Sequence, residues 1–540
     1  MQLISEASAE KLRGGFYTPE PIADFILRWA FSGVSEPKVL EPSCGDGIFL
    51  DRMRQGGMRY ASVKATELHP EEAEKARRVG LERCTVESRD FFEYCNSTTD
   101  RFDLVVGNPP FIRYQFFDKA LRAEAEQIFA RADLKYSKLT NAWVSFVLGS
   151  SLLLEERGKI GFVVPAEILQ VSFAKTLRQF ISRFYNKINI VSFRQLVFPD
   201  IQQEVVLLLC ERDGSGTHRI DHIEVDDTDA LDGLDVRQLQ APQKAIDFES
   251  NKWTFYFLEQ EEIDFIERIK ADPRFKPLAD FARVEVGITT GANPFFTVPQ
   301  SVVETYGLGD FARPMVGRSV QVASSVFTQA DWAKNRDADA RANLLVFPEK
   351  KHLQAHPGAL AYIADGEARG IHEGYKCRIR DAWQTVPSLW VSDALFLRRN
   401  NLFPKFVVNE AAAYTTDTMH RVKIKPEVHL NALVASYYNS LSLAFTEICG
   451  RSHGGGVLEL MPNEVGRVVI PYHSDNAALL GTVDAALRQG DPIGTLLAKT
   501  NPPILQARYG LSDTDVKLAH RIWTKLSNRR LQRGKKKPNS

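Results

Sequence analysis

The chain has 540 residues, with 68 Lys and Arg balanced by 68 Asp and Glu, so its formal net charge is zero. Hydrophobic residues make up 44% and charged residues 25%, the composition of a globular protein long enough for two to four domains. A pI of about 7.2 excludes a uniformly basic nucleic-acid-binding chain, although it is compatible with a local basic cleft.

No segment of the sequence predicts secretion or membrane insertion. The N-terminal residues 1–12 lack an apolar signal, and no run approaches the roughly 18 apolar residues of a membrane span. Six cysteines are scattered without Cys-x-x-Cys pairs, which argues against a zinc site and against a disulfide framework. We therefore expect a cytoplasmic protein with no membrane partner and no metal.

The first predicted strand, over residues 38–43, leads into a glycine turn and a helix. Gly45 and Gly47 match the start of a G-x-G-x-x-G motif, but Leu50 stands where the third glycine would be. Dinucleotide-binding folds need these glycines to approach a pyrophosphate and to pack the helix closely, so a ligand without phosphates fits better. S-adenosylmethionine is such a ligand: its amino-acid end can lie over the turn, with Glu41 facing its ammonium group.

Two further strands end in side chains suited to the rest of this cofactor. One ends at Glu67, followed by Leu68, and lies 20 residues beyond Gly47, the spacing at which an acidic residue meets ribose hydroxyls. The next ends with Asp90 and Phe91, which suit the amino group and the ring of adenine. The ordered series predicts a cofactor site at one sheet edge.

The apolar run 102–107 predicts a buried parallel strand, which Pro109 and Pro110 end because neither can donate a ladder hydrogen bond. Open α/β sheets place their ligands at this carboxyl end. The Asn108 side-chain oxygen and the Pro109 carbonyl can each accept one N–H of a planar amino group, which frees the nitrogen lone pair for attack. Phe111 can stack on a base that has left its duplex.

Beyond this motif, the polar residues 113–138 predict an insertion, and apolar strands recur before an acidic stretch near the domain boundary at 240–250. The strand at 204–212 is followed by a glycine-rich turn and a strand at 218–225, which predicts a hairpin closing a mostly parallel sheet. The other predicted strands are 159–166 and 186–193.

A second aromatic surface for the base is predicted at Phe198, with Phe193 as the alternative. Aromatic residues beside strands are equally typical of a hydrophobic core. Both interpretations stay open from the sequence.

The second half of the chain predicts an α+β domain with irregular loops and no second catalytic set. Basic and aromatic residues interleave in these loops, a pattern that suits contacts to phosphates and base edges. The candidate DNA contacts are Arg313, Arg318, Lys376, Arg378, Arg380, Arg451 and His453. The basic residues 526–540 are expected to be a disordered tail.

Taken together, these motifs resemble the amino-group DNA methyltransferases of the gamma arrangement, found in restriction-modification systems. In that arrangement the cofactor motifs precede the catalytic motif and the target-recognition domain comes last. Residues 16–19, which include Thr18 and Pro19, resemble the opening motif that closes over the cofactor. The segments 39–47, with Ser43 in its turn, and 141–169 resemble further motifs of the family.

The resemblance implies a Rossmann-like methyltransferase domain over residues 1–245, a target-recognition domain over 246–525 and the tail. It implies methyl transfer from S-adenosylmethionine to adenine N6 in double-stranded DNA after base flipping, because asparagine rather than serine heads the catalytic motif. It also implies a bacterial or archaeal cytoplasmic setting, in which a separate cognate endonuclease is a candidate partner.

Two alternatives remain at this point. A methyltransferase of the same fold can act on guanine in RNA or on a protein glutamine, and analysis of the methylated product separates these. The second alternative is a non-catalytic DNA-specificity subunit that keeps the cofactor fold only as a relic. A measurement of cofactor binding would distinguish such a subunit from an active methyltransferase.

Overall fold

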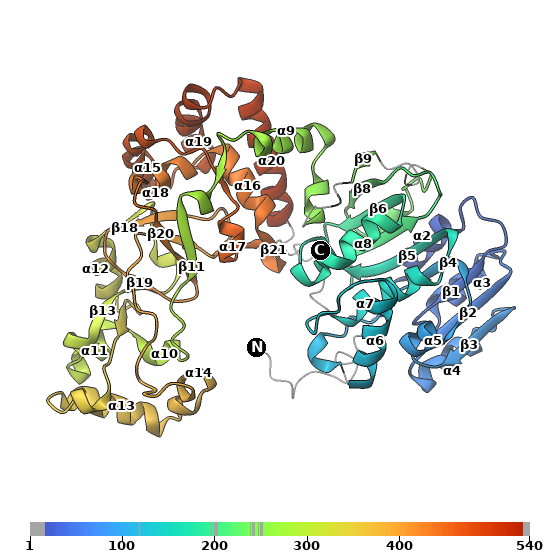
Figure 1. Cartoon of the computed structure of the whole chain (residues 1–540), viewed down its shortest axis with the longest axis horizontal. Coiled ribbons are helices and arrows are strands. Elements are labelled where there is room, and N and C mark those ends of the chain that lie inside the picture. The colour runs from blue at the N-terminus through green and yellow to red at the C-terminus, as the bar shows by residue number, and fades with distance from the viewer. Residues whose placement is uncertain are drawn as a thin grey trace. The chain divides into compact units, whose positions relative to one another are not determined.

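A computed structural model of the chain describes residues 17–532, apart from 118, 196, 199–203, 238, 240–242, 247 and 249–251. The chain divides into two compact units, Met1–Ile263 and Asp264–Ser540 (Figure 1). Within the described residues, no helix is long and apolar enough to cross a membrane, and no group of three or more His, Cys, Asp and Glu is arranged to hold a metal ion.

The first unit is built on a sheet with the strand order β3-β2-β1-β4-β5-β7-β6-β8-β9. Strands β1 to β5 run parallel to one another, β7 is antiparallel to both of its neighbours, and β8 is parallel to β6. This is the predicted Rossmann-like fold of S-adenosylmethionine-dependent methyltransferases. The strands are β1 Lys38–Glu41, β2 Ser62–Glu67, β3 Cys84–Ser88, β4 Phe102–Gly107, β5 Leu154–Pro165, β6 Lys187–Phe193, β7 Val205–Glu211, β8 Arg219–Val225 and β9 Lys244–Ala245.

The predicted pairing of the last long strands is wrong in one respect. β8 does not form a hairpin with β7 but crosses to the far side of β6 and pairs with it in parallel. Asn186, just before β6, holds the crossing: its side-chain oxygen accepts the N–H groups of Asp213 and Gly214 at 3.1 and 3.3 Å. Since β6 and β7 are both buried along almost their whole length, their sequences do not reveal which one β8 joins.

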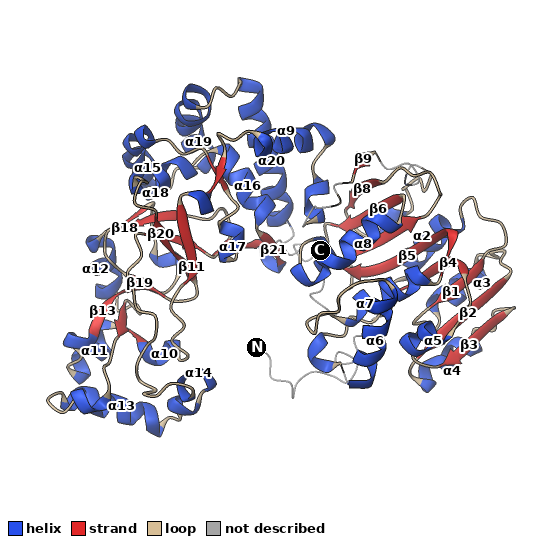
Figure 2. Ribbon diagram, viewed as in Figure 1, coloured by secondary structure: helices blue, strands red, loops and turns tan. Residues whose placement is uncertain are grey.

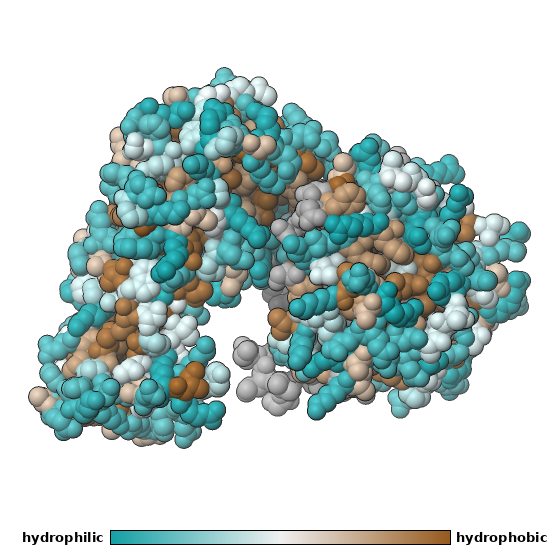
Figure 3. Space-filling view, in the orientation of Figure 1, coloured by the Kyte–Doolittle hydropathy of each residue, from teal (hydrophilic) through white to brown (hydrophobic). Residues whose placement is uncertain are grey.

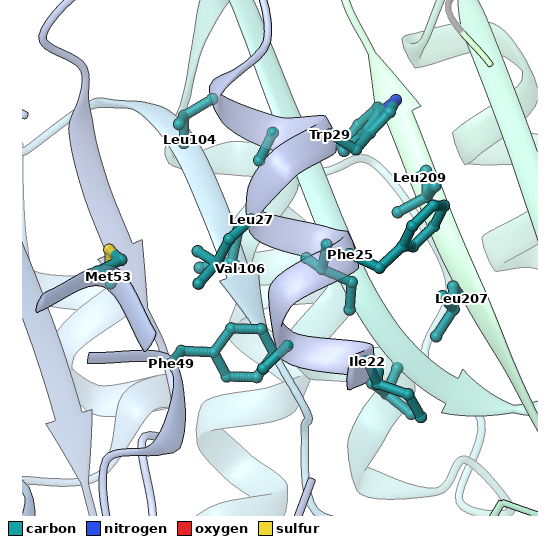
Figure 4. Close-up of a cluster of buried hydrophobic side chains, with 14 of the residues drawn as sticks. Ile22, Phe25, Leu27, Trp29, Phe49, Met53, Leu104, Val106, Leu207 and Leu209 are labelled. Atoms are coloured by element: carbon teal, nitrogen blue, oxygen red, sulfur yellow. The ribbon is translucent and has the colours of Figure 1, made fainter. Parts of the chain in front are cut away.

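Helix α2, Glu20–Phe31, packs on the sheet with an almost continuous buried surface. Figure 4 shows Phe25 and Trp29 of α2 close to Leu209 of β7, with Leu27 near Val106 of β4. Pro21 lies in the first turn of α2, where a backbone N–H has no helical partner to lose. The other helices of the unit are α3 Ile48–Gln55, α4 Pro70–Arg78, α5 Phe91–Ser97, α6 Lys119–Arg131, α7 Ala142–Leu152 and α8 Lys175–Phe184.

Residues 113–138, expected as a polar insertion, contain α6. The helix packs against α5 and α7 and buries Ala125, Ile128 and Phe129. Its few apolar residues lie on one face, which explains why the segment looks polar overall.

The second unit has the expected α+β character, with short strands between many helices (Figure 2). Its sheets have the orders β11-β20-β16-β18-β14, β12-β15-β13-β19, β17-β22-β21 and β10-β23. The strands are β10 Lys276–Pro277, β11 Ala282–Val286, β12 Thr297–Val298, β13 Ala312–Val316, β14 Val326–Phe327, β15 Asn343–Leu345, β16 Ala394–Leu397, β17 Arg399–Asn400, β18 Phe406–Asn409, β19 Tyr414–Thr415, β20 Met419–Ile424, β21 Arg451–His453, β22 Val457–Glu459 and β23 Val469–Ile470. The helices are α9 Gln260–Ala271, α10 Asn293–Phe296, α11 Gln300–Tyr306, α12 Gln329–Asp337, α13 Pro357–Ala368, α14 Tyr375–Arg378, α15 Leu430–Tyr437, α16 Ser440–Cys449, α17 Pro462–Val465, α18 Leu480–Gln489, α19 Ile493–Asn501 and α20 Asp513–Gln532.

Two boundaries differ from those expected. The tail does not begin at 526, because α20 continues to Gln532 and the buried guanidinium of Arg530 forms an ion pair with Glu447 at 2.7 Å. Residues 533–540 lie outside the described residues. The first unit ends at 263 rather than 245, because the 3-10 helix Trp253–Phe257 packs on β8.

The later boundary predicts a difference between two fragments of the first unit. A fragment ending at residue 263 should unfold cooperatively, whereas one ending at 245 should be less stable by roughly 3 kcal/mol or more, because it loses the buried side chains of Trp253 and Tyr256. Denaturant unfolding of both fragments measures this. Equal midpoints and slopes would show that residues 246–263 do not belong to this fold.

Candidate active site

The carboxyl ends of β3, β2, β1 and β4 form one edge of the sheet. The strands are parallel and adjacent, and their register aligns Glu41 with Ala65 and Glu67 with Ser88. Asn108 directly follows the end of β4, and Asp90 stands two residues after the end of β3. The structure therefore brings the residues predicted from four separate segments to the same edge.

The glycine turn between β1 and α3 depends on two left-handed residues. Gly47 has φ 94°, and a Cβ there would lie 2.9 Å from the Ala76 Cα of α4, so only glycine fits. Gly45 has φ 54°, and a Cβ there would meet nothing within 4 Å, so the space beside it is open. Leu50, at the position of the missing third glycine, is fully buried in the core.

Glu67 links the glycine turn to the end of β2. One carboxylate oxygen accepts the Gly45 N–H at 3.0 Å, and the other accepts the His69 N–H at 2.9 Å. Each oxygen keeps a second lone pair, so the carboxylate can still accept a ribose hydroxyl. The side chain of Glu67 is buried, whereas the neighbouring Leu68 is 48% exposed and presents an apolar surface.

Glu41 is a buried carboxyl group whose surroundings do not compensate its charge. Glu41 is 1% exposed, and its side-chain oxygen Oε2 has no hydrogen-bond partner among the described residues. Burial raises the pKa of Glu41 well above its usual value, and the charges of Asp46 and Glu67 raise it further. Asp46, in the glycine turn, was not predicted from the sequence, and burial likewise raises its pKa. A cation bound beside Glu41 would stabilise its ionised form.

Asp90 and Phe91 are placed differently from each other. Asp90 caps α5, with one side-chain oxygen accepting the N–H groups of Phe92 and Glu93, and burial raises the pKa of Asp90. The Phe91 ring is 2% exposed and stacks on Phe146 with centroids 5.1 Å apart. The expectation that this ring covers adenine is therefore wrong, because the core occupies its face.

The Asn108–Phe111 loop is held by its neighbours. The Ser43 hydroxyl donates to the Asn108 carbonyl at 3.5 Å, which joins this loop to the glycine turn. Downstream, Asn141 at the start of α7 accepts the Tyr114 N–H at 3.1 Å. Asn141 was not among the predicted site residues, although its place at the head of a helix is typical of a capping side chain.

Pro109 is buried, while Asn108, Pro110 and Phe111 are half-buried. Phe111 packs against the hydrophobic cluster that contains Phe193 and Phe198. These two rings are only 6% and 5% exposed. Their proposed part in a base pocket stays a prediction.

The opening segment leads into α2 beside the glycine turn. The Pro19 carbonyl accepts the N–H groups of the first turn of α2, and Thr18 is buried. Phe16 lies outside the described residues.

The predicted DNA contacts of the second unit separate into two groups. Arg313, Arg318, Lys376 and Arg378 are exposed. Figure 3 shows hydrophobic surface over α14, the helix that carries the last two, and the neighbouring Tyr375 and Ile379 are 67% and 61% exposed.

The remaining three are engaged within the protein. Arg380 donates to the carbonyls of Thr289 and Thr290 at 3.2 and 2.6 Å and so stabilises a loop of its own unit, and its role as a DNA contact stays a prediction. Arg451 pairs with Glu464, and His453 contacts Glu459, each at 2.9 Å.

Residues 250–505 match the family model of the C-terminal domain of Type II methyltransferase M.Eco57I, and residues 61–198 match that of the Eco57I restriction-modification methylase. The chain belongs to the restriction-modification methyltransferases. It is 22% identical to Type II methyltransferase M.AccI of Acinetobacter calcoaceticus over 84% of each chain, and 23% identical to M.XamI of Xanthomonas campestris pv. amaranthicola over 85% of each. Among solved structures it is similar to the type IIG restriction endonuclease BpuSI, with 13% identity, a TM-score of 0.43, and coverage of 97% of this chain and 67% of that one.

S-adenosylmethionine is the cofactor of this methyltransferase, and the sheet edge fits it. The uncompensated Glu41 carboxyl suits the ammonium group, and the open space at Gly45 leaves room over the turn. Glu67 suits the ribose hydroxyls, and exposed Leu68, rather than Phe91, offers an apolar face for the adenine ring.

Replacing Glu41 by glutamine should separate stability from cofactor binding. Because the folded-state pKa of Glu41 is raised, this group favours folding at acid pH and loses that contribution as the pH rises through the folded-state value. The cofactor-free Glu41→Gln variant should therefore be more stable than wild type at about pH 8, with the difference shrinking toward pH 5. Its affinity for S-adenosylmethionine should fall roughly tenfold or more.

Denaturant unfolding across this pH range and calorimetric titration give the two readouts. Glu82→Gln, at an exposed position just before β3, is the matched control and should change neither the stability nor the affinity for S-adenosylmethionine. Unchanged cofactor affinity in Glu41→Gln would contradict the assignment.

Proposed function

We propose that this chain methylates the N6 amino group of adenine at a specific site in double-stranded DNA, after flipping the base out of the helix. The observation that carries the proposal is the loop Asn108–Phe111, which directly follows the carboxyl end of β4, next to the strand that ends at Glu41. A purine amino group held there would lie on the cofactor side of the sheet edge.

The residues of the loop suit an amino group whose lone pair is delocalised into a ring. The Asn108 side-chain oxygen and the Pro109 carbonyl accept its two N–H groups and favour a pyramidal nitrogen. They also stabilise the positive charge that develops on that nitrogen as it attacks, which lowers the barrier. When bound, S-adenosylmethionine supplies an electrophilic methyl group. Phe111 gives the extruded base a stacking surface in place of its lost neighbours.

Adenine is favoured over cytosine because asparagine heads the motif, by the family resemblance described above. DNA is favoured over RNA or protein by the family to which the chain belongs and by the match of its second unit to the C-terminal domain of a Type II methyltransferase. In that unit, exposed Arg313, Arg318, Lys376 and Arg378 are the candidate phosphate and base contacts.

The setting follows from the same reasoning. We infer a bacterial or archaeal cytoplasm, where host DNA is accessible. A separate endonuclease that recognises the same site is the candidate partner.

The Asn108→Ala variant should lose methyl transfer by a factor of roughly one hundred or more, because one acceptor of the reacting amine is removed. Cofactor affinity should stay within about twofold of wild type. Transfer of labelled methyl groups to DNA, followed by digestion to nucleosides, measures both the rate and the product. Near-normal turnover in this variant, or methyl groups recovered on cytosine, would overturn the corresponding part of the proposal.

Phe111→Ala should lower turnover on fully paired duplex, whereas Phe111→Trp should retain much of it, because base stacking on an aromatic ring is worth about 1–3 kcal/mol. An abasic site opposite the target should partly rescue Phe111→Ala, since less pairing must be broken. Two variants that both match wild type on paired DNA would assign Phe111 to the core alone.

A further inference from the structure

Two segments of the first unit meet beside the Asn108–Phe111 loop. Residues 112–117 continue from Phe111, and residues 134–142 run into the first residue of α7. The Ala142 N–H donates to the Ile112 carbonyl at 3.0 Å, and the Tyr114 N–H donates to the Asn141 side chain at 3.1 Å. We call these two segments together the lip.

The lip exposes large apolar side chains. Phe116 is 45% exposed and Leu139 is 56% exposed. Burying such side chains against a partner is favourable, so their exposure next to a catalytic loop indicates a contact surface.

The lip is also cationic. Arg113, Lys135 and Lys138 are exposed, and neither segment contains an acidic residue. None of the three cations forms an ion pair with any residue that the structure describes. Arg122 differs, because its guanidinium donates to the carbonyls of Tyr114 and Phe117 and so fixes the backbone of the lip.

We propose that the lip grips the DNA strand on either side of the extruded base. Arg113 and Lys138 contact phosphates, and Phe116 and Leu139 pack against the bases left beside the gap. This rests on the proposed function, since it assumes a duplex from which one base is removed. DNA fits the surface because it combines negative charge with stackable bases, and unstacking a base pair leaves apolar faces that such side chains can cover.

The charge contacts can be tested by the salt dependence of DNA binding. In the double variant Arg113→Gln, Lys138→Gln, the slope of log affinity against log salt should fall in magnitude by about 2, because each phosphate contact contributes roughly 0.9. Arg157→Gln is the control: Arg157 is exposed near the amino end of β5, at the sheet edge opposite Asn108, and its loss should leave the slope unchanged.

The apolar contacts can be tested by turnover. The double variant Phe116→Ala, Leu139→Ala should lose roughly tenfold in kcat/KM on paired duplex, and most of this loss should disappear when an abasic site lies opposite the target. Leu402→Ala, at a position 64% exposed in the second unit, is the control. The four replaced side chains of the lip, Arg113, Phe116, Lys138 and Leu139, are all exposed. The variants should therefore fold normally, which unchanged melting curves and an unchanged affinity for S-adenosylmethionine would verify.

A wild-type chain that binds and methylates DNA, together with lip variants that match their controls, would overturn this inference and leave the proposed function intact. A lip variant that changed only the oligomeric state would assign the surface to contacts between copies of the chain, which also overturns it. A wild-type chain that does not bind duplex DNA would overturn both.

Discussion

A carboxyl group taken out of water must either stay protonated or find a cation, and Glu41 is in this position at the end of β1. Burial and the nearby Asp46 and Glu67 all disfavour its charge. The cofactor-free enzyme thus holds a group whose ionised form is disfavoured, at the point where the ammonium group of S-adenosylmethionine is expected. Binding of the cofactor would offset the free-energy cost of the buried Glu41 charge. The same carboxyl group would therefore destabilise the cofactor-free protein and contribute to its affinity for S-adenosylmethionine.

The rest of the first unit keeps that group in place. Parallel pairing of β1 with β2 and β4 aligns the strand ends, and Glu67 uses both oxygens to join the glycine turn to β2. The Ser43 hydroxyl extends the connection to the Asn108–Phe111 loop through its hydrogen bond to the Asn108 carbonyl. These partly buried hydrogen bonds connect the glycine turn, the end of β2 and the Asn108–Phe111 loop at one sheet edge. Such a connection suits a direct transfer between two groups bound there.

Much of this edge was predictable because each strand end carries a local signal. The steric requirement at Gly47 permits only glycine, and two prolines after β4 must end a ladder. The pairing of β8 was not predictable, since it depends on the buried environment shared by β6 and β7 and on hydrogen bonds from Asn186, which is distant in sequence.

Side-chain roles were harder to predict than strand ends. Phe91 follows a strand just as a ligand-stacking ring would, yet Phe146 covers it. The charges of Arg380 and Arg530 are typical of side chains that contact solvent or phosphate. In the structure both contact groups of their own unit: Arg380 donates to backbone carbonyls, and Arg530 pairs with Glu447. Sequence patterns report residue type and spacing, whereas these outcomes depend on which distant groups pack nearby.

Binding of the cofactor ammonium group should lower the raised pKa of Glu41, so that this carboxyl group loses its proton as the cofactor binds. Calorimetric titration of S-adenosylmethionine at about pH 6.5, in two buffers of different ionisation enthalpy, measures the protons exchanged, and an α-amino group stays largely protonated there. We expect proton release by the wild-type chain and a clearly smaller release by Glu41→Gln. Binding enthalpies that do not depend on the buffer, or equal release by both chains, would contradict this expectation.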